Sequence, residues 1–216
     1  MTIHKPIVRI FYTRVDEEIA PRQMQQYLAL ITPAMQDTVT NYHNWRDRQS
    51  ALFGKLLLRI GLHSFGIDPG NLSQILWNDF GSPFFHQGAN FNLSHSGNQV
   101  VCAVSLDTRL GIDIEQVRQV DLTEFHSTMT TRQWKEIYAS GNPIKEFFRL
   151  WALKESVIKA DGRGLSIPLA SLETGNPIKY ENNSWYLTPV DSPEGYAAFL
   201  SSDLPDPQIE YTEVKF

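Results

Sequence analysis

An alternating pattern in the segment GIDIE, residues 111–115, constrains the fold of this chain more than any other feature. Successive side chains of a β-strand point to opposite faces, so Asp113 and Glu115 share one face while Ile112 and Ile114 share the other. Such a strand must bury its isoleucine face in a core and leave its carboxylates on a polar side. Taken alone, the pattern usually means a strand with one solvated face.

A second charged segment, WALKESVIK at 151–159, follows about forty residues later and is predicted to be helical. Trp151, Glu155 and Lys159 are spaced four residues apart, so they lie on one helix face. A surface salt bridge between Glu155 and Lys159 is the ordinary interpretation, but the apolar residues around them predict a half-buried helix. If helix and strand pack together, three carboxylates and an amine meet, and they form a hard-cation site beside a proton donor or acceptor.

Composition places the chain among ordinary soluble globular proteins. Its 216 residues carry a net charge of −5, with 42% hydrophobic and 20% charged residues, which suits one large domain or two small ones. The mild acidity argues against a nucleic-acid binder. The single cysteine, Cys102, excludes a disulfide framework and favours a reducing compartment. No signal-peptide pattern occurs in residues 1–15 and no apolar stretch could span a bilayer, so we expect a cytoplasmic protein.

Hydrophobic periodicity and β-branched residues divide the chain into two similar series of elements. The order suggests an α+β fold with two related halves, residues 1–107 and 108–216, although sequence self-similarity is too weak to identify a repeat. The predicted strands are 6–15, 74–77, 90–93, 100–106, 111–115 and several segments within 178–216. The predicted helices are 16–31, 46–65, 144–160 and one long or two short helices within 123–140.

Two further motifs point to anion binding. Ser94 and His95 are adjacent on a strand end and therefore face opposite sides, which argues against a nucleophile–base pair. With loop amides near Gly97 they could hold a phosphate, although a polar β-turn is the ordinary alternative. Arg46 and Arg48 at a helix start could grip phosphate in fork geometry, but such pairs are more often simply solvated. The chain shows no zinc-ligand spacing or calcium loop, and an all-carboxylate set favours Mg²⁺.

Taken together, these segments resemble the Sfp-type 4′-phosphopantetheinyl transferase family. The resemblance covers most of residues 7–170, and the matching segments are FNLSHSG (91–97), GIDIE (111–115), FRLWALKESVIKADGRGLSIPL (148–169), NDFGSP (78–83) and RDRQSALFGKLLLR (46–59). It implies two pseudo-symmetric α+β halves, each a small and mostly antiparallel sheet packed on a long helix, with the active site in the cleft between them. The implied reaction transfers 4′-phosphopantetheine from coenzyme A to a serine hydroxyl of an apo acyl or peptidyl carrier protein, and releases 3′,5′-adenosine bisphosphate.

The resemblance also implies roles for individual residues. The metal ligands for Mg²⁺ on the pyrophosphate would be Asp113, Glu115 and Glu155, with water beside the apolar Ile114. Glu155 would accept the serine proton, directly or through water, and Lys159 would neutralise charge on the bridging or leaving phosphate. The coenzyme A contacts would be Ser94 and His95 on phosphates, Gly81, Ser82 and Pro83 along the adenine, and Arg48 with Arg46 on the 3′-phosphate. The first half would thus hold coenzyme A, and the second half would hold the metal, the catalytic helix and the carrier.

Several positions depart from the family pattern. The family's lysine in the 78–83 turn is Ser82 here, and basic residues often found in relatives are replaced by Met35, Thr38 and Ser50. Each change removes a cation that would contact a coenzyme A phosphate. We therefore expect weaker coenzyme A binding than in a fully basic relative, with the chemistry retained.

The carrier protein is expected to dock near Met129 to Ile137, between the two charged segments. The apolar contacts would come from Phe125, Met129, Trp134 and Ile137, with Arg132 and Lys135 facing an acidic carrier helix. The alternative is that Trp134 and Ile137 are simply core residues. The resemblance favours a monomer.

Two rival functions remain at the level of sequence. One is a Mg²⁺-dependent hydrolase of a pyrophosphate nucleotide, which would use the same carboxylates to activate water. The other is a non-catalytic module that binds coenzyme A or a carrier protein. We expect neither a nucleic-acid partner nor a membrane partner for this protein.

Overall fold

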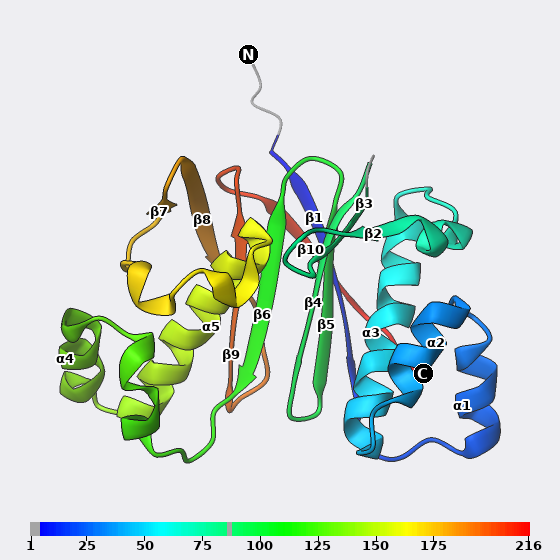
Figure 1. Cartoon of the computed structure of the whole chain (residues 1–216), viewed down its shortest axis with the longest axis horizontal. Coiled ribbons are helices and arrows are strands. Elements are labelled where there is room, and N and C mark those ends of the chain that lie inside the picture. The colour runs from blue at the N-terminus through cyan, green and yellow to red at the C-terminus, as the bar shows by residue number, and fades with distance from the viewer. Residues whose placement is uncertain (1–4, 86–87) are drawn as a thin grey trace.

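The computed structural model describes residues 5–85 and 88–216, and it shows two β-sheets side by side, each with a long helix packed on it (Figure 1). The first sheet has the order β10-β1-β5-β4, antiparallel except for the parallel pair β1–β10. Its strands are β1 (Ile7–Arg14), β4 (Asn90–Ser96), β5 (Gln99–Ser105) and β10 (Gln208–Glu213).

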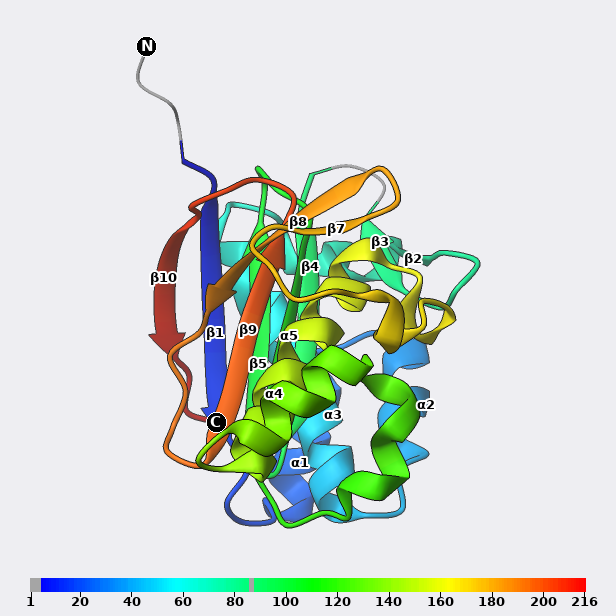
Figure 2. The ribbon, with the colours of Figure 1, turned by 90° about the vertical axis from the view of Figure 1, so that its left-hand side faces the viewer.

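The second sheet is antiparallel throughout and has the order β6-β9-β8-β7. Its strands are β6 (Leu110–Gln116), β7 (Ile178–Tyr180), β8 (Asn183–Pro189) and β9 (Tyr196–Ser202). A separate short hairpin is formed by β2 (Ile75–Trp77) and β3 (Pro83–Phe85). The last strand of the chain, β10, lies beside β1 in the first sheet (Figure 2), so the end of the chain returns to the half in which it began.

The long helices are α3 (Trp45–Ser64), which packs on the first sheet, and α5 (Pro143–Asp161), which packs on the second. The shorter helices are α1 (Pro21–Leu28), α2 (Pro33–Thr40) and α4 (Thr131–Ala139), and the 3₁₀ turns are η1 (Pro69–Gln74), η2 (Leu122–Thr128), η3 (Gly164–Ser166) and η4 (Leu169–Ser171). The expected α+β fold with two sheet-and-helix halves, mostly antiparallel, is confirmed. Among the described residues, no helix is both long and apolar enough to cross a membrane.

The short helices explain where the sequence prediction was too coarse. The predicted helix 16–31 is confined to α1 because Pro21 is compatible only with a helix start. Thr32 then caps a separate helix, α2, by accepting a hydrogen bond from the backbone N–H of Met35 at 3.4 Å. The segment 123–140 divides into η2 and α4, because Thr130 and Gln133 form a capping box that starts the second helix.

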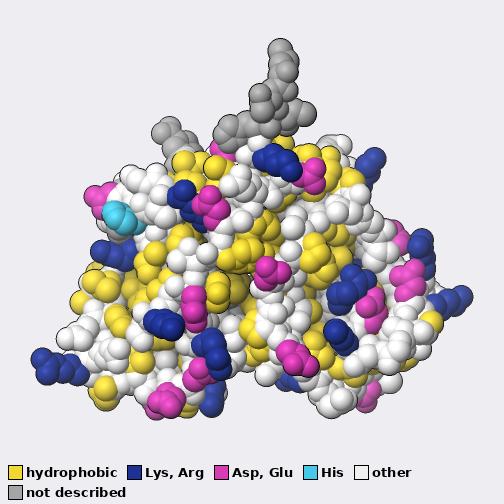
Figure 3. Space-filling view, turned by 180° about the vertical axis from the view of Figure 1, so that it is seen from behind, with side chains coloured by type: hydrophobic (Ala, Val, Ile, Leu, Met, Phe, Trp, Pro, Cys, Tyr) yellow, Lys and Arg dark blue, Asp and Glu magenta, His cyan; other side chains and the backbone are white. Residues whose placement is uncertain are grey.

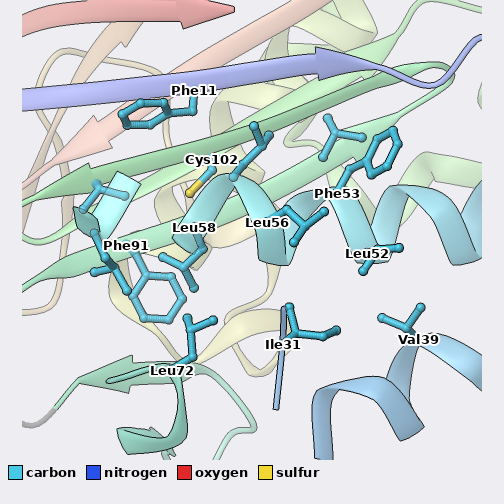
Figure 4. Packing of buried hydrophobic residues seen from close by; sticks show 14 of the residues in the cluster. Phe11, Ile31, Val39, Leu52, Phe53, Leu56, Leu58, Leu72, Phe91 and Cys102 are labelled. Carbon is cyan, nitrogen blue, oxygen red and sulfur yellow. The ribbon is translucent and has the colours of Figure 1, made fainter. Parts of the chain in front are cut away.

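Apolar clusters hold each helix on its sheet and join the two sheets. Side chains of α3 interlock with those of the first sheet around the fully buried Cys102 (Figure 4). A second cluster packs α5 on its sheet. A third lies between the two sheets and includes Ile112 and Ile114, with 0% and 2% of their surface exposed, which confirms the predicted isoleucine face of the strand. On the face seen from behind, positive and negative side chains are interspersed around hydrophobic ones (Figure 3).

Candidate active site

The edge strands β4 and β6 of the two sheets face each other along a seam joined by side chains. Alternate residues of β4 turn a polar side chain toward β6, and each accepts a hydrogen bond from an alternate backbone N–H of β6. The bonds run from Ile112 N to Asn92 Oδ1 (3.1 Å), from Ile114 N to Ser94 Oγ (3.4 Å) and from Gln116 N to Ser96 Oγ (3.1 Å). The period of two in both strands thus brings the LSHS segment against the carboxylates of GIDIE.

Asp113 lies at the centre of this seam. Its Oδ1 accepts hydrogen bonds from Lys159 Nζ at 2.6 Å and from Ser94 Oγ at 2.8 Å, and Lys159 Nζ also donates to Ser94 Oγ at 2.9 Å. Its other oxygen, Oδ2, is buried and has no hydrogen-bond partner among the described residues. Burial raises the pKa of the Asp113 carboxyl, while Lys159 and Ser94 act in the opposite direction. An unpartnered carboxylate oxygen at this depth needs a cation or a proton to be stable.

A close approach of strand to helix brings Lys159 within reach of Asp113. Gly111 at the start of the segment has no side chain, and a Cβ there would overlap the carbonyl oxygen of Ser156 and the backbone nitrogen of Ala160. The glycine therefore lets β6 lie directly against the backbone of α5. Without it, the carboxylates of β6 and the amine of α5 would be held farther apart.

The two glutamates complete the acidic cluster. Glu115 accepts a hydrogen bond from Ser96 Oγ at 2.7 Å, and its pKa is raised by burial and by the charge of Asp113. Glu155 lies on the half-buried face of α5 with Trp151 and Lys159, as the spacing predicts. Burial, with smaller effects of Asp113 and Glu115 against that of Lys159, raises the pKa of Glu155 to about 7. The three carboxylates therefore lie near enough to one another to disfavour simultaneous ionisation.

Carboxylate oxygens are suitable ligands for a divalent cation, but the three carboxylates are not arranged around a common point in this structure. Among the residues that the structure describes, no three His, Cys, Asp or Glu side chains lie close enough to form a metal-binding group. Lys159 and Ser94 occupy Oδ1 of Asp113, and Ser96 occupies Oε2 of Glu115. The buried, unpartnered Oδ2 of Asp113 is the observation that fits a hard divalent cation.

His95 lies on the other face of β4 from Ser94, so the structure confirms that the two side chains cannot act as a nucleophile–base pair. Phe91 and Leu93 share this face with it and pack in the α3 cluster. The His95 ring is exposed. Its pKa is lowered by desolvation and then by the charge of Lys159, and Lys55 of α3 lowers it further. The charges of Asp47 and Asp113 act in the opposite direction, so cations and carboxylates both lie near this part of β4.

The turn 78–83 is held against the end of α5 by Asn78, whose role sequence reasoning missed. Its Oδ1 accepts hydrogen bonds from the backbone N–H groups of Phe80 and Ser82 at 3.0 and 2.8 Å, as in an Asx turn. Its Nδ2 donates to the carbonyl of Gly162 at 2.8 Å. The exposed Gly81 has a φ of 76°, a conformation that favours glycine.

This arrangement creates a cavity of about 260 Å³ between the two halves. Ser82 and Pro83 line it from the turn, Asn92 lines it from β4, and Lys159 lines it from α5. The predicted adenine-contacting turn and the predicted catalytic lysine therefore face one space.

Arg46 and Arg48 lie elsewhere. The Arg46 guanidinium rests over the ring of Trp45, 4.3 Å from its centroid, and lines a separate open depression with Gly97 and Tyr196. Arg48 donates to the carbonyl of Tyr42 at 3.2 Å and pairs with Glu18 at 3.4 Å. Neither arginine lines the cavity that contains Lys159. Their predicted contact with the 3′-phosphate stays a prediction.

The segment expected to receive a carrier protein is mostly core. Met129, Trp134 and Ile137 have 3%, 8% and 0% of their surface exposed, so the expectation that they present apolar contacts to a partner is wrong. They pack with Phe147 and other residues of α5, which confirms the alternative for Trp134 and Ile137. Phe125 is half-buried beside them.

Polar residues do face outward from α4. Arg132 and Lys135 are exposed, and Arg132 pairs with Glu136 on the same helix at 2.9 Å. The exposed aromatic side chain of α4 is Tyr138, with 53% of its surface accessible. A partner that reaches α4 would therefore meet Arg132, Lys135 and Tyr138.

Lys154 is a second residue whose role the sequence did not reveal. It is fully buried, and its Nζ donates to the carbonyls of Thr128 (3.1 Å) and Leu169 (3.0 Å) and to Gln133 Oε1 (2.5 Å). Desolvation lowers the pKa of its amine to about 8. Lys154 therefore ties α5 to the segments on both sides of it, and Glu155 is the next residue along the helix.

Comparison with known proteins agrees with this geometry. The family model described as the 4′-phosphopantetheinyl transferase superfamily matches residues 109–197, and the one described as 4′-phosphopantetheinyl transferase, N-terminal, matches residues 18–107. The transferase gsp of Aneurinibacillus migulanus is 30% identical over 202 residues, which cover 91% of this chain and 85% of that protein.

More distant relatives carry related names. The transferase Sfp of Bacillus subtilis is 24% identical over 222 residues, 97% of this chain and 98% of that protein. The human L-aminoadipate-semialdehyde dehydrogenase-phosphopantetheinyl transferase is 29% identical over 172 residues, 71% of this chain and 56% of that protein.

The seam of carboxylates, lysine and hydroxyls suits an enzyme that acts on a phosphate-bearing substrate. The chain belongs to the 4′-phosphopantetheinyl transferase superfamily. Enzymes of this family transfer phosphopantetheine from coenzyme A to carrier proteins, and the chain is an enzyme of this class.

Proposed function

We propose that the reaction takes place at the β4–β6–α5 seam, depends on Mg²⁺, modifies a serine hydroxyl of the carrier and releases 3′,5′-adenosine bisphosphate. The observation that carries the proposal is the buried Oδ2 of Asp113, which has no partner among the described residues. Two further carboxylates, those of Glu115 and Glu155, have raised pKa values to which the charge of Asp113 contributes.

Asp113, Glu115 and Glu155 are the residues that would hold the metal. When bound, Mg²⁺ would neutralise charge on the pyrophosphate of coenzyme A and stabilise the charge that grows on the leaving group. Lys159 would act on the same phosphates, because its ammonium lines the cavity and stands beside Asp113. Ser94 keeps both side chains in place through its two hydrogen bonds.

Glu155 is the proposed proton acceptor for the serine hydroxyl. A general base works best when its pKa lies near the working pH, and the pKa of Glu155 is raised to about 7. Its position one helical turn before Lys159 places a base and a cation on the same half-buried face of α5. The proton would move from the serine to Glu155 as the hydroxyl attacks phosphorus.

Coenzyme A is proposed to lie along the inner faces of both halves. The turn Gly81–Pro83 would follow the adenine, and Ser94 and His95 would meet phosphates from the two faces of β4. Arg48, with Arg46, would reach the 3′-phosphate only by leaving their present contacts with Glu18 and Trp45.

The carrier protein is proposed to dock near residues 129–137 through the exposed Arg132 and Lys135, with Tyr138 beside them. Cations on an exposed helix suit an acidic carrier helix. Because the described site residues come from one chain, we propose a monomer. The fully buried Cys102 fits a reducing compartment such as the cytoplasm.

A mass measurement tests the reaction. Protein, Mg²⁺, coenzyme A and an apo carrier protein are incubated, and the carrier is then weighed. A phosphopantetheine increment is the expected result, whereas adenosine bisphosphate released without a carrier would indicate hydrolysis. Binding of coenzyme A without either product would indicate a binding module.

The base is tested with Glu155→Gln, matched by Glu213→Gln on the exposed end of β10. The first variant is expected to lose transfer by about 10²–10⁴-fold while it still binds coenzyme A, and the second is expected to behave as wild type. An active Glu155→Gln enzyme would refute the role of the base.

A further inference from the structure

A second cavity, of about 380 Å³, lies between α2, α3, the β2–β3 hairpin and β4. Its lining includes the aromatic rings of Trp77 and Phe91, with Pro83 beside them. Leu58, Leu72 and Phe91 form part of the apolar packing seen from close by (Figure 4). Among the described lining residues, Lys55 alone carries a charge.

Lys55 is a half-buried cation that forms no ion pair with a carboxylate among the described residues. Its Nζ donates to the carbonyl of Ala51, on its own helix, at 3.3 Å. Its pKa is lowered through desolvation. An ammonium offers three N–H donors, and one of them is used by the carbonyl of Ala51, so the group can also bind an anion.

The second cavity adjoins the catalytic one. Pro83 and Phe91 line both spaces, so a ligand that passes the turn 78–83 can occupy both. Lys159 stands in one cavity and Lys55 in the other, and the charges of both lower the pKa of His95. The two lysines therefore provide separate cations for one ligand that carries anionic groups at both ends of a flat, apolar middle.

Coenzyme A has this distribution of charge, with a pyrophosphate on one side of the adenosine and a phosphomonoester on its ribose. We propose that Lys55 is a further ligand of the 3′-phosphate of coenzyme A, one that needs no rearrangement of Arg46 or Arg48. Trp77, Pro83 and Phe91 provide the apolar walls for the adenosine. The inference rests on the proposed placement of the pyrophosphate at Lys159. It gives α3 a specificity residue that distinguishes coenzyme A from its 3′-dephospho form.

Calorimetric binding of coenzyme A and of 3′-dephospho-coenzyme A tests this role. Lys55→Met is expected to raise the Kd for coenzyme A by about ten- to hundredfold, the effect of one charge-assisted contact, and to leave the Kd for the dephospho form unchanged. Lys55→Arg should retain most of the discrimination. The control Lys179→Met removes an equal charge from the exposed strand β7 and should change neither Kd.

A complementary variant adds a cation instead of removing one. Met35 lines the same cavity and is half-buried, so Met35→Lys is expected to tighten binding of coenzyme A but not of the dephospho form. In the Lys55→Met background it should restore the lost discrimination. The single variant Met35→Lys does not depend on whether Lys55→Met folds.

The inference is overturned if the ratio of the two Kd values is the same in wild type, Lys55→Met and Met35→Lys. It is also overturned if Lys55→Met weakens both ligands equally. Its failure can be told apart from failure of the proposed function. Lys55-dependent discrimination without any transfer would refute the proposed function and support the role of Lys55, whereas transfer with unchanged discrimination would do the reverse.

Discussion

Replacement of Gly111 by alanine tests whether the contact between β6 and α5 sets the geometry of the site. The new Cβ would overlap the backbone of Ser156 and Ala160, and it would lie 2.9 Å from the Cα of Ala160. These are backbone atoms that no rotamer change can move. The helix α5 must therefore shift away from the strand, and Glu155 and Lys159 must shift with it.

The size of the effect follows from the overlap. To restore ordinary contact distances, α5 has to move by about 1 Å, because carbon atoms pack at about 3.5–4 Å. Such overpacking is expected to lower the free energy of unfolding by about 2–3 kcal/mol. A displacement of about 1 Å in the reacting groups is expected to lower the transfer rate by about 10²-fold.

The assay pairs urea denaturation with the rate of carrier modification at saturating coenzyme A. Gly141→Ala is the matched control, since a Cβ there meets nothing within 4 Å and the backbone is not in the left-handed region. That change should leave stability equal or higher by up to about 1 kcal/mol. A Gly111→Ala protein as stable and as active as wild type would refute the reasoning. Lost stability with an unchanged rate would refute its catalytic part.

Four other predictions concern the site and its support. Because the pKa of Glu155 is raised to about 7 in the absence of metal and the base must be ionised, the rate at saturating coenzyme A should fall as pH drops below 7. The fall should approach about tenfold per pH unit at limiting Mg²⁺ and be smaller at high Mg²⁺, and a flat profile at limiting Mg²⁺ would contradict this. The same raised pKa lowers stability as pH rises from 4.5 to about 7, so Glu155→Gln should unfold at higher urea than wild type at pH 8. Lys154→Met removes a buried amine that donates to three acceptors and should lose about 2–4 kcal/mol in urea denaturation, unlike Lys135→Met on the surface. A chelator should stop carrier modification and added Mg²⁺ should restore it, with Asp113→Asn requiring more Mg²⁺; full activity in chelator would exclude the metal.

Lys55 changes one expectation drawn from sequence. Neutral residues at Ser82, Met35, Thr38 and Ser50 predict weaker coenzyme A binding than in a basic relative. The proposed contact of Lys55 would offset part of that loss from a different helix. The ratio of the affinities for coenzyme A and its dephospho form measures how far Lys55 offsets this loss.

Local patterns determined the parts of this protein that depend on neighbours in the chain. The alternation in 111–115 fixed which side chains of β6 enter the core, because a strand repeats every two residues. The four-residue spacing of Trp151, Glu155 and Lys159 fixed their common face on α5 in the same way. The long helices and most strands follow from such periodicity, and so do the fold class and the members of the acidic cluster.

The tertiary structure decided the features that depend on distant segments meeting. Only the pairing of the two sheet edges shows that Ser94 bridges Asp113 and Lys159 while His95 faces α3. Only packing shows that Trp134 is core, since exposed and buried aromatic residues look alike in a sequence.

The same limit applies to charge. A lysine in a predicted helix is ordinarily taken as solvated, and no local pattern indicates that Lys154 is buried among carbonyls or that Lys55 faces a cavity. Whether a charge is satisfied depends on the atoms that surround it in space, and those atoms come from elements far apart along the chain.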